Sequence, residues 1–452
     1  MSTTTVAPRT KPLKVAMASF IGTGIEYYDF FIYGTAAALV FPKLFFPDQS
    51  PLIATLLSFA TFGVGFFARP VGGVVFGHFG DRIGRKKMLV ISLMGMGAAT
   101  FCMGLLPGYA TIGILAPILL TLLRLLQGFC VGGEWGGATL MAVEHAPVGK
   151  RGLYGAFPQM GAPAGTALAT LAFLTVAQLP DEQFLSWGWR IPFLLSAALV
   201  IVGLFIRLTI GESPEFVAVH NQHAEVKLPI KVAFQKYWRQ ILLVAGIYFS
   251  QGIFAYICIS YFVSYATAVV KLDRASALLG VFAAGVVAVF LYGYFGSLSD
   301  RIGRKTTYMI GAVAMAVSIW PAVALINTGN PWLFGLAIVL VFGIAMAPAG
   351  GATGSLFSLM FGAEVRYTGV SVGYTLSQIT GSAFAPLIAV ALYGAIGNTN
   401  GLVIYLLAAS AVTIISLLIL PGPWGRKEAA IQLEYAGTKT DFAADADVPA
   451  HS

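Results

Sequence analysis

The sequence is poor in charged residues. Only 10% of its 452 residues are Asp, Glu, Lys or Arg, whereas a soluble domain usually carries about 25%. This shortage excludes an ordinary globular protein, including one with a single membrane anchor. The apolar share of 58% is instead typical of a protein that is embedded in lipid.

Cysteine and histidine are scarce as well. Cys102, Cys130 and Cys258 stand singly in apolar stretches without metal-ligand spacing, so we interpret them as packing residues. The five histidines form no catalytic cluster, and no nucleophile–base pair or phosphate-binding loop is apparent. We therefore expect no enzymatic activity, no metal and no cofactor.

Long apolar stretches recur along the whole chain instead. A helix needs about 20 such residues to cross a hydrocarbon core ~30 Å thick, and the ~10-residue alternating segments of a membrane β-barrel are missing. The predicted fold is an all-α membrane protein with twelve transmembrane helices. The predicted spans, numbered 1 to 12, are 15–41, 52–78, 88–107, 113–143, 153–178, 190–210, 241–268, 275–298, 307–326, 332–360, 369–396 and 402–421.

The distribution of Lys and Arg predicts the orientation. With the N-terminus inside, the cytoplasmic segments hold 21 of the 27 basic residues and the outer loops hold four. Cytoplasmic loops of membrane proteins carry such an excess, so both termini are predicted to be cytoplasmic. The net charge of +8 then reports membrane orientation, and no nucleic-acid partner is expected.

The hexapeptide Asp-Arg-Ile-Gly-Arg-Lys occurs twice, beginning at Asp81 and at Asp300. Each copy follows the second span of a six-span half, and a second matched pair of loops, 144–152 and 363–369, follows each fourth span. Two matched loops in register predict a parallel duplication into two pseudo-symmetric six-helix halves. The predicted organisation is a cytoplasmic N-terminus (1–14), a first bundle (15–210), a cytoplasmic linker (211–240), a second bundle (241–421) and a disordered cytoplasmic tail (422–452).

Several stretches carry a family resemblance over about residues 15–420. The loop "GHFGDRIGRKK" (77–87) resembles the signature of the major facilitator superfamily, and "RLLQGFCVGG" (124–133) resembles its span-4 arginine motif. "YYDFFIYG" (27–34) and "GGEWGGATLMAVEHAP" (132–147) resemble, within that superfamily, the metabolite:proton symporters. That family includes permeases for shikimate, α-ketoglutarate, citrate, proline and betaine.

The resemblance implies alternating access with proton coupling in a bacterial-type cytoplasmic membrane. It also implies that the repeated loops latch the two halves together in the outward-facing state. The alternative is that the basic residues of these loops serve only membrane orientation, which would not explain the two matched aspartates. The predicted latch residues are Asp81, Arg82, Arg85, Asp300, Arg301 and Arg304.

Ionisable residues inside spans are costly, at least ~2.5–3.5 kcal/mol each, so each needs a reason. Glu26 and Asp29 are three residues apart and share one face of span 1. Because two nearby carboxylates in a low dielectric disfavour a second negative charge, one of them is a candidate proton carrier. The alternative is that both simply pair with Arg69 or Arg124.

Arg124 and Glu134 are ten residues apart, about 15 Å along a helix, so each needs a partner on another span. The resemblance implies that Arg124 faces span 1 and modulates the protonatable carboxylate. Glu134 is a further proton-site candidate or, alternatively, a structural hydrogen-bonding residue. Arg69 can clamp a substrate carboxylate or pair permanently with an acid such as Glu26.

Spans 7 to 12 carry amides but no interior charge. The candidate substrate contacts, including polar groups that suit a small hydroxylated or carboxylated ligand, are Arg69, Tyr27, Tyr33, Gln127, Gln251, Tyr374 and Gln378.

The predicted function is proton symport of a small organic acid by a monomer. Uptake of a zwitterionic osmolyte such as betaine or proline is the alternative within the same fold. A sugar porter is suggested by "GESPEF" (211–216), but its counterpart after span 12 is missing; "GAPAGTALA" (161–169) only loosely approaches an exporter motif. A non-transporting membrane sensor remains the alternative from another class.

Overall fold

The computed structural model describes residues 12–83, 85–132, 134–147, 149–209, 229–362 and 365–420. The tail 422–452, most of the linker and most of the N-terminus therefore lie outside the described residues. The side chains of Asp81, Arg82, Arg85 and Glu134 lie outside them too, although their backbones are helical.

Every predicted span coincides with a helix or a run of consecutive helices. The first half contains α1 (Pro12–Leu39), α3 (Pro51–Ile83), α4 (Arg85–Leu105), α6 (Leu115–Val131) continued by α7 (Glu134–Glu144), α8 (Arg151–Ala177) and α10 (Arg190–Thr209). Short elements join them: α2 (Phe41–Leu44), α5 (Tyr109–Ile112), α9 (Asp181–Gln183) and the π-helix η1 (Phe184–Gly188).

The helices of the second half are more often interrupted. It contains α12 (Pro229–Tyr256), η2 (Ile257–Tyr261) and α13 (Phe262–Ala268); α14 (Arg274–Ile302); α15 (Arg304–Ile326); α16 (Pro331–Ile338), η3 (Val339–Ala345) and α17 (Ala347–Leu359); α18 (Arg366–Thr380), η4 (Ser382–Phe384) and α19 (Ala385–Ile396); and α20 (Asn400–Ile419). Within the expected linker, α12 already begins at Pro229, where the ring of proline suits a first helical turn. The helix has a kink at Tyr237.

Nine helical segments of the described chain are long and apolar enough to cross a membrane on length and composition alone. The helices α1, α4 and α6 fall short of that threshold, and 90–105 and 115–131 are recorded as shorter apolar helices. Together these segments account for the twelve predicted spans.

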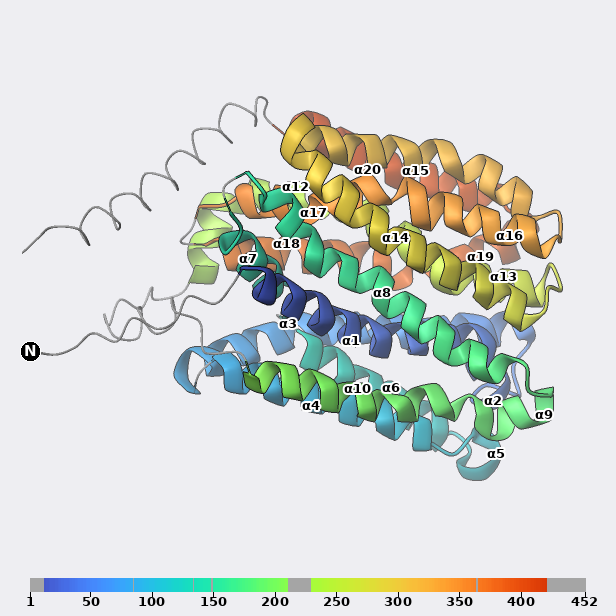
Figure 1. Ribbon diagram of the computed structural model, residues 1–452. Helices are drawn as coiled ribbons and strands as arrows, with labels where there is room; N and C mark the ends of the chain where they lie inside the picture. Colours follow the sequence, from blue (N-terminus) through green and yellow to red (C-terminus); the bar gives the residue numbers. More distant parts are fainter. Residues whose placement is uncertain are drawn as a thin grey trace, which may run out of the picture.

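The two halves form two bundles that lie side by side (Figure 1). The helix α8 of the first half packs against α1 of its own half and against α14 of the second half. Figure 1 shows α8 between these two helices. Groups on α1, α8 and α14 can therefore meet at the boundary between the halves.

Candidate functional site

Close helix packing in the first half places two arginines together. A Cβ added at Gly128 of α6 would lie 1.9 Å from the Gly65 carbonyl oxygen of α3, so the two backbones are in contact there. Only glycine permits this approach. A Cβ at Gly65 would in turn lie 2.9 Å from Nε of Arg124. Arg124 on α6 and Arg69 on α3 consequently reach the same group of aromatic rings.

Arg124 is buried in an aromatic cage. Its Cζ lies 4.2 Å from the ring centroid of Phe30, 4.3 Å from that of Tyr33 and 4.8 Å from that of Phe62. Its Nη1 donates to Oε1 of Gln127, while its Nη2 has no hydrogen-bond partner among the described residues. The guanidinium is therefore stabilised by ring faces, in the manner of cation–π contacts.

Asp29 is completely buried, and neither carboxylate oxygen has a hydrogen-bond partner in the described part of the chain. Its backbone carbonyl accepts a hydrogen bond from Nε2 of Gln127 at 3.2 Å, and the same Nε2 donates to Oγ1 of Thr100 at 2.8 Å. Gln127 thus connects the guanidinium of Arg124 to the backbone of Asp29 without touching the carboxylate.

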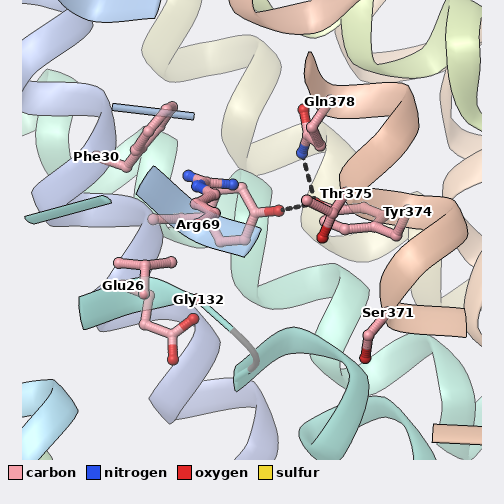
Figure 2. Close-up of a pocket in the computed structure, with 10 residues that line it drawn as sticks. Glu26, Phe30, Arg69, Gly132, Ser371, Tyr374, Thr375 and Gln378 are labelled. Carbon is pink, nitrogen blue, oxygen red and sulfur yellow. Dashed lines mark hydrogen bonds between the residues drawn. The ribbon is translucent and has the colours of Figure 1, made fainter. Parts of the chain in front are cut away.

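A pocket lies between α1, α3, α6 and α18 (Figure 2). Glu26, Phe30 and Arg69 lie on its first-half side, and Tyr374 and Gln378 lie opposite. We call it the first pocket; its lining residues are Glu26, Tyr27, Phe30, Arg69, Val131, Gly132, Ser371, Tyr374, Thr375 and Gln378.

Arg69 is held in this pocket by aromatic rings. Its Cζ lies 4.4 Å from the ring centroid of Phe66 and 4.7 Å from that of Phe30. Its Nε has no hydrogen-bond partner among the residues described. Opposite it, Nε2 of Gln378 donates to the hydroxyl of Tyr374 at 2.7 Å.

A second pocket lies between α1, α8 and helices of the second half. It is lined by Tyr27, Phe31, Gln159, Ala162, Pro163, Thr166, Tyr248, Gln251, Gly252, Ala255, Tyr256, Tyr292, Phe342 and Met346. The hydroxyls of Tyr27 and Tyr374 share a hydrogen bond of 2.7 Å, and Tyr27 lines both pockets. This tyrosine pair therefore stands at the boundary between the two pockets.

The polar groups of the second pocket are uncharged. Oε1 of Gln251 accepts hydrogen bonds from the hydroxyls of Tyr308 at 2.8 Å and Thr353 at 3.0 Å. Nε2 of Gln159, a residue only 4% exposed, has no partner among the described residues. A buried amide donor of this kind is costly unless it is satisfied, so the pocket favours an occupant with a hydrogen-bond acceptor.

Five of the seven predicted substrate contacts line a pocket: Arg69, Tyr27, Gln251, Tyr374 and Gln378. The other two do not. The Tyr33 hydroxyl donates to Thr61 beneath Arg124, and Gln127 belongs to the Asp29 network. Of the predicted proton carriers, Glu26 lines the first pocket, while Asp29 lies outside both linings. The roles of these residues remain predictions.

Sequence reasoning overlooked Gln159, Tyr292 and Phe30. The amide of Gln159 within an apolar span was an available signal, because interior polar groups need a reason. Phe30 gave no signal, since one phenylalanine among 33 is indistinguishable by sequence.

One end of the molecule, here called the latch end, joins the halves through the second copy of the repeat. The amide of Gly152 donates to Oδ1 of Asp300 at 2.7 Å, and that of Leu153 donates to Oδ2 at 3.1 Å. Arg304 pairs with the same carboxylate at 3.3 Å, whereas Arg301 is exposed.

An ion pair also crosses between the halves at this end. Arg366 at the start of α18 pairs with Glu144 at the end of α7 at 3.5 Å. The ends of the two halves are thus in contact at two places that involve the matched loops.

The opposite end is joined as well. Nη1 of Arg274 on α14 lies 2.8 Å from Oδ1 of Asp181, and its Nη2 donates to the carbonyl of Leu179 at 2.9 Å. Its Cζ lies 4.1 Å from the ring centroid of Phe184. The two pockets therefore lie between ends that are both bridged.

Comparison with known proteins places the chain in a family. The profile of the family "Sugar (and other) transporter" matches residues 14–231. The chain is 44% identical to the inner membrane metabolite transport protein YhjE of Escherichia coli (strain K12), over 90% of this chain and 93% of that protein. It is 41% identical to the shikimate transporter of the same strain, over 90% and 94% of the two chains. The chain belongs to the major facilitator superfamily, and within it to the metabolite:proton symporter family.

The solved structures agree on the fold. The D-xylose-proton symporter has a TM-score of 0.70 at 17% identity and covers 90% of this chain and 97% of its own. This likeness confirms the predicted twelve-helix fold of the superfamily. The relatives named here are transport proteins, so this multi-pass membrane protein is a transporter and not an enzyme.

Proposed function

We propose that this transporter carries out proton-coupled symport of a small organic acid by alternating access, as a monomer in the bacterial cytoplasmic membrane. The observation that carries the proposal is that the first half contains two separate charged groups. Arg69 is a cation that lines a pocket, and Asp29 is a buried carboxylate without a hydrogen-bond partner in the described chain. The first suits an anionic ligand and the second suits a transported proton. No cofactor other than the proton is involved.

The first pocket takes the carboxylate of the substrate. A guanidinium offers parallel donors that match a carboxylate, and the hydroxyls and amide of Tyr27, Tyr374 and Gln378 surround the same space. The second pocket takes the uncharged hydroxylated part, because its lining combines aromatic rings with amide and hydroxyl groups.

Asp29 is the preferred proton carrier. The carboxylate of Asp29 is 0% exposed and has no salt-bridge partner among the described residues, and an isolated buried charge is costly, so this side chain suits the binding of a transported proton. Glu26, which lines the first pocket, is the alternative carrier.

The names of the relatives suggest two substrate classes for this chain, an organic acid and a zwitterion. The 41% identical relative is named as a shikimate transporter, and shikimate combines a carboxylate with hydroxyls. The second candidate is a zwitterion, because a relative that is 33% identical over 89% of this chain is named as the proline/betaine transporter of Escherichia coli (strain K12). Arg69 and Arg124 already lie on the Phe30 ring, which disfavours a quaternary ammonium group there.

The test uses purified protein in proteoliposomes that contain a pH-sensitive dye. Shikimate, α-ketoglutarate, citrate, protocatechuate, betaine and glucose are added outside one at a time. Acidification of the lumen with an acid supports the proposal, and acidification with betaine alone favours the zwitterion. If folded protein gives no acidification of the lumen with any of these solutes, proton symport of these substrate classes is contradicted.

A further inference from the structure

Phe30 is shared by the two interior arginines. The Cζ of Arg124 lies 4.2 Å and the Cζ of Arg69 lies 4.7 Å from the centroid of its ring. Arg124 belongs to the network around Asp29, whereas Arg69 lines the first pocket. Figure 2 shows Phe30 next to Arg69 on the first-half side of that pocket.

The Phe30 ring is held in place by its neighbours. It is 5% exposed, and the ring centroids of Phe62, Phe66 and Tyr256 lie 5.0, 5.1 and 5.7 Å from its own. Because protein interiors are close-packed, a ring surrounded in this way has little freedom to follow either cation. A change in the position of one guanidinium therefore alters its contact with a fixed ring.

We propose that Phe30 is the positioning residue that couples the proton site to the substrate arginine, an inference that rests on the proposed function. We place a substrate carboxylate as the alternative partner of Arg69 and the ionised carboxylate of Asp29 as that of Arg124, because Gln127 already joins the guanidinium of Arg124 to the backbone of Asp29. When either cation moves to its alternative partner, the Phe30 ring interacts with the other cation alone.

The expected coupling between substrate and proton binding is positive, as symport requires. A substrate anion draws Arg69 away from the ring, and Arg124 then binds Phe30 more strongly and stays away from Asp29. Asp29 keeps its proton as a result, so substrate and proton favour each other's binding. Linkage requires the converse with the same factor: loss of the proton draws Arg124 to Asp29, and the ring then holds Arg69 against the substrate.

Other groups near the two arginines can bear charge. Glu26 and Tyr33 lie on α1 with Asp29, and Tyr256 ends α12. Direct electrostatic interaction among these groups and the two arginines is the competing explanation of any coupling. It does not require the Phe30 ring, and this difference makes the proposal testable.

Two neighbouring phenylalanines supply matched controls. Phe66 contacts Arg69 with a distance of 4.4 Å from Cζ to its ring centroid, and Phe62 contacts Arg124 at 4.8 Å. Both rings are fully buried and pack against Phe30. Replacing any of the three by leucine removes one ring from the same cluster, but only Phe30→Leu removes a ring that both arginines touch.

The first experiment measures the dissociation constant of labelled shikimate from the purified protein at one pH below and one pH above neutrality. We expect the native chain to bind shikimate about tenfold better at the lower pH, within the usual range of coupling between sites. Phe30→Leu should reduce this ratio to under about twofold. Phe66→Leu should weaken affinity by a similar factor at both pH values, and Phe30→Tyr should restore the native ratio. A native ratio in Phe30→Leu would overturn the proposal.

The second experiment needs no transported solute, so it also tests the role of Phe30 if none of the organic acids proves to be a substrate. The infrared carbonyl band of protonated Asp29, assigned by its loss in Asp29→Asn, is titrated in the native chain and in Phe30→Leu, each with and without Arg69→Gln. We expect Arg69→Gln to shift the titration in the native chain and to shift it several-fold less in Phe30→Leu. Equal shifts in both backgrounds would assign the coupling to direct electrostatics and overturn the role of the ring.

Discussion

Oδ1 of Asp300 in the second half accepts a hydrogen bond from the backbone amide of Gly152 in the first half, with an N–O distance of 2.7 Å. The carboxylate lies at the first residues of α8, so it satisfies amides that a helix start leaves unpaired and faces the positive end of the helix dipole. The repeated hexapeptide therefore joins the halves through a side chain and a helix start. Arg304, four residues after Asp300, pairs at 3.3 Å with the same Oδ1 that accepts from Gly152.

Asp300→Asn should weaken closure of the latch end. Hydrogen bonds to a charged group contribute about 1.5–3 kcal/mol and neutral ones about 1 kcal/mol, so the amide should cost ~1 kcal/mol and shift the closed-to-open ratio about fivefold. The measurement is the distance distribution between spin labels at Lys150 and Arg301, which are exposed on opposite halves. Asp273→Asn is the control, because Asp273 caps the start of α14 within its own half. An unchanged distribution in Asp300→Asn would exclude the latch role.

Gly152→Val should prevent closure of the same end. A Cβ at Gly152 would lie 2.4 Å from the Gly296 carbonyl oxygen and 2.8 Å from Cγ of Asp300, distances that real Cβ atoms do not adopt. The same spin-label pair should report only the open distance, and uptake should fall at least tenfold, as for loss of more than ~1.4 kcal/mol. Gly22→Ala, where nothing lies within 4 Å of the added Cβ, should leave both unchanged. Native uptake by Gly152→Val would show that this contact is not formed during the transport cycle.

The sequence was sufficient for the fold because its signals are long and repeated. Twelve apolar stretches and two matched loops each extend over many residues, so errors at single positions do not change the result. The interior charges can also be identified from the sequence, since an arginine within a membrane span is rare. Arg69 and Arg124 are therefore functional candidates because of their positions inside apolar spans, and Arg124 also because of its motif.

The partners of these charges could not be predicted in the same way. Either acid on span 1 could have paired with Arg124, yet that guanidinium contacts Phe30, Tyr33 and Phe62 instead. Rings are common in membrane spans, and only the approach of α3 to α6 at glycine decides which of them meet a cation. Pairing thus depends on the depth and rotation of helices, which a hydrophobic pattern leaves undetermined.

At the opposite end, Arg274→Ala should disturb closure more than Asp181→Asn does. Asp181 is 74% exposed, and exposed ion pairs contribute only about 0.2–1 kcal/mol. Arg274 also donates to the Leu179 carbonyl and lies on the Phe184 ring, and both contacts survive the loss of the Asp181 charge. Spin labels at the exposed residues Glu182 and Thr328 would measure the separation at this end. A larger effect of Asp181→Asn would show that the ion pair, and not the ring and carbonyl contacts, closes this end.

Asp29→Asn should separate transport from proton coupling. The amide cannot bind the proton, but it has nearly the shape of the carboxylic acid, and the backbone bond to Gln127 remains. Exchange of labelled shikimate across vesicles without a pH gradient should continue, while accumulation driven by a pH gradient should fall to background. Asp48→Asn, at an exposed carboxylate, is the matched control and should behave as the native chain does.

Glu26→Gln distinguishes the two carboxylates of α1. Because Glu26 lines the first pocket and Asp29 does not, its amide should change the affinity for shikimate while leaving accumulation coupled to the pH gradient. The reverse outcome, with coupled accumulation in Asp29→Asn and exchange alone in Glu26→Gln, would assign the proton to Glu26. In that case the proton and the substrate carboxylate would share the first pocket, and the substrate would compete directly with Glu26 for Arg69.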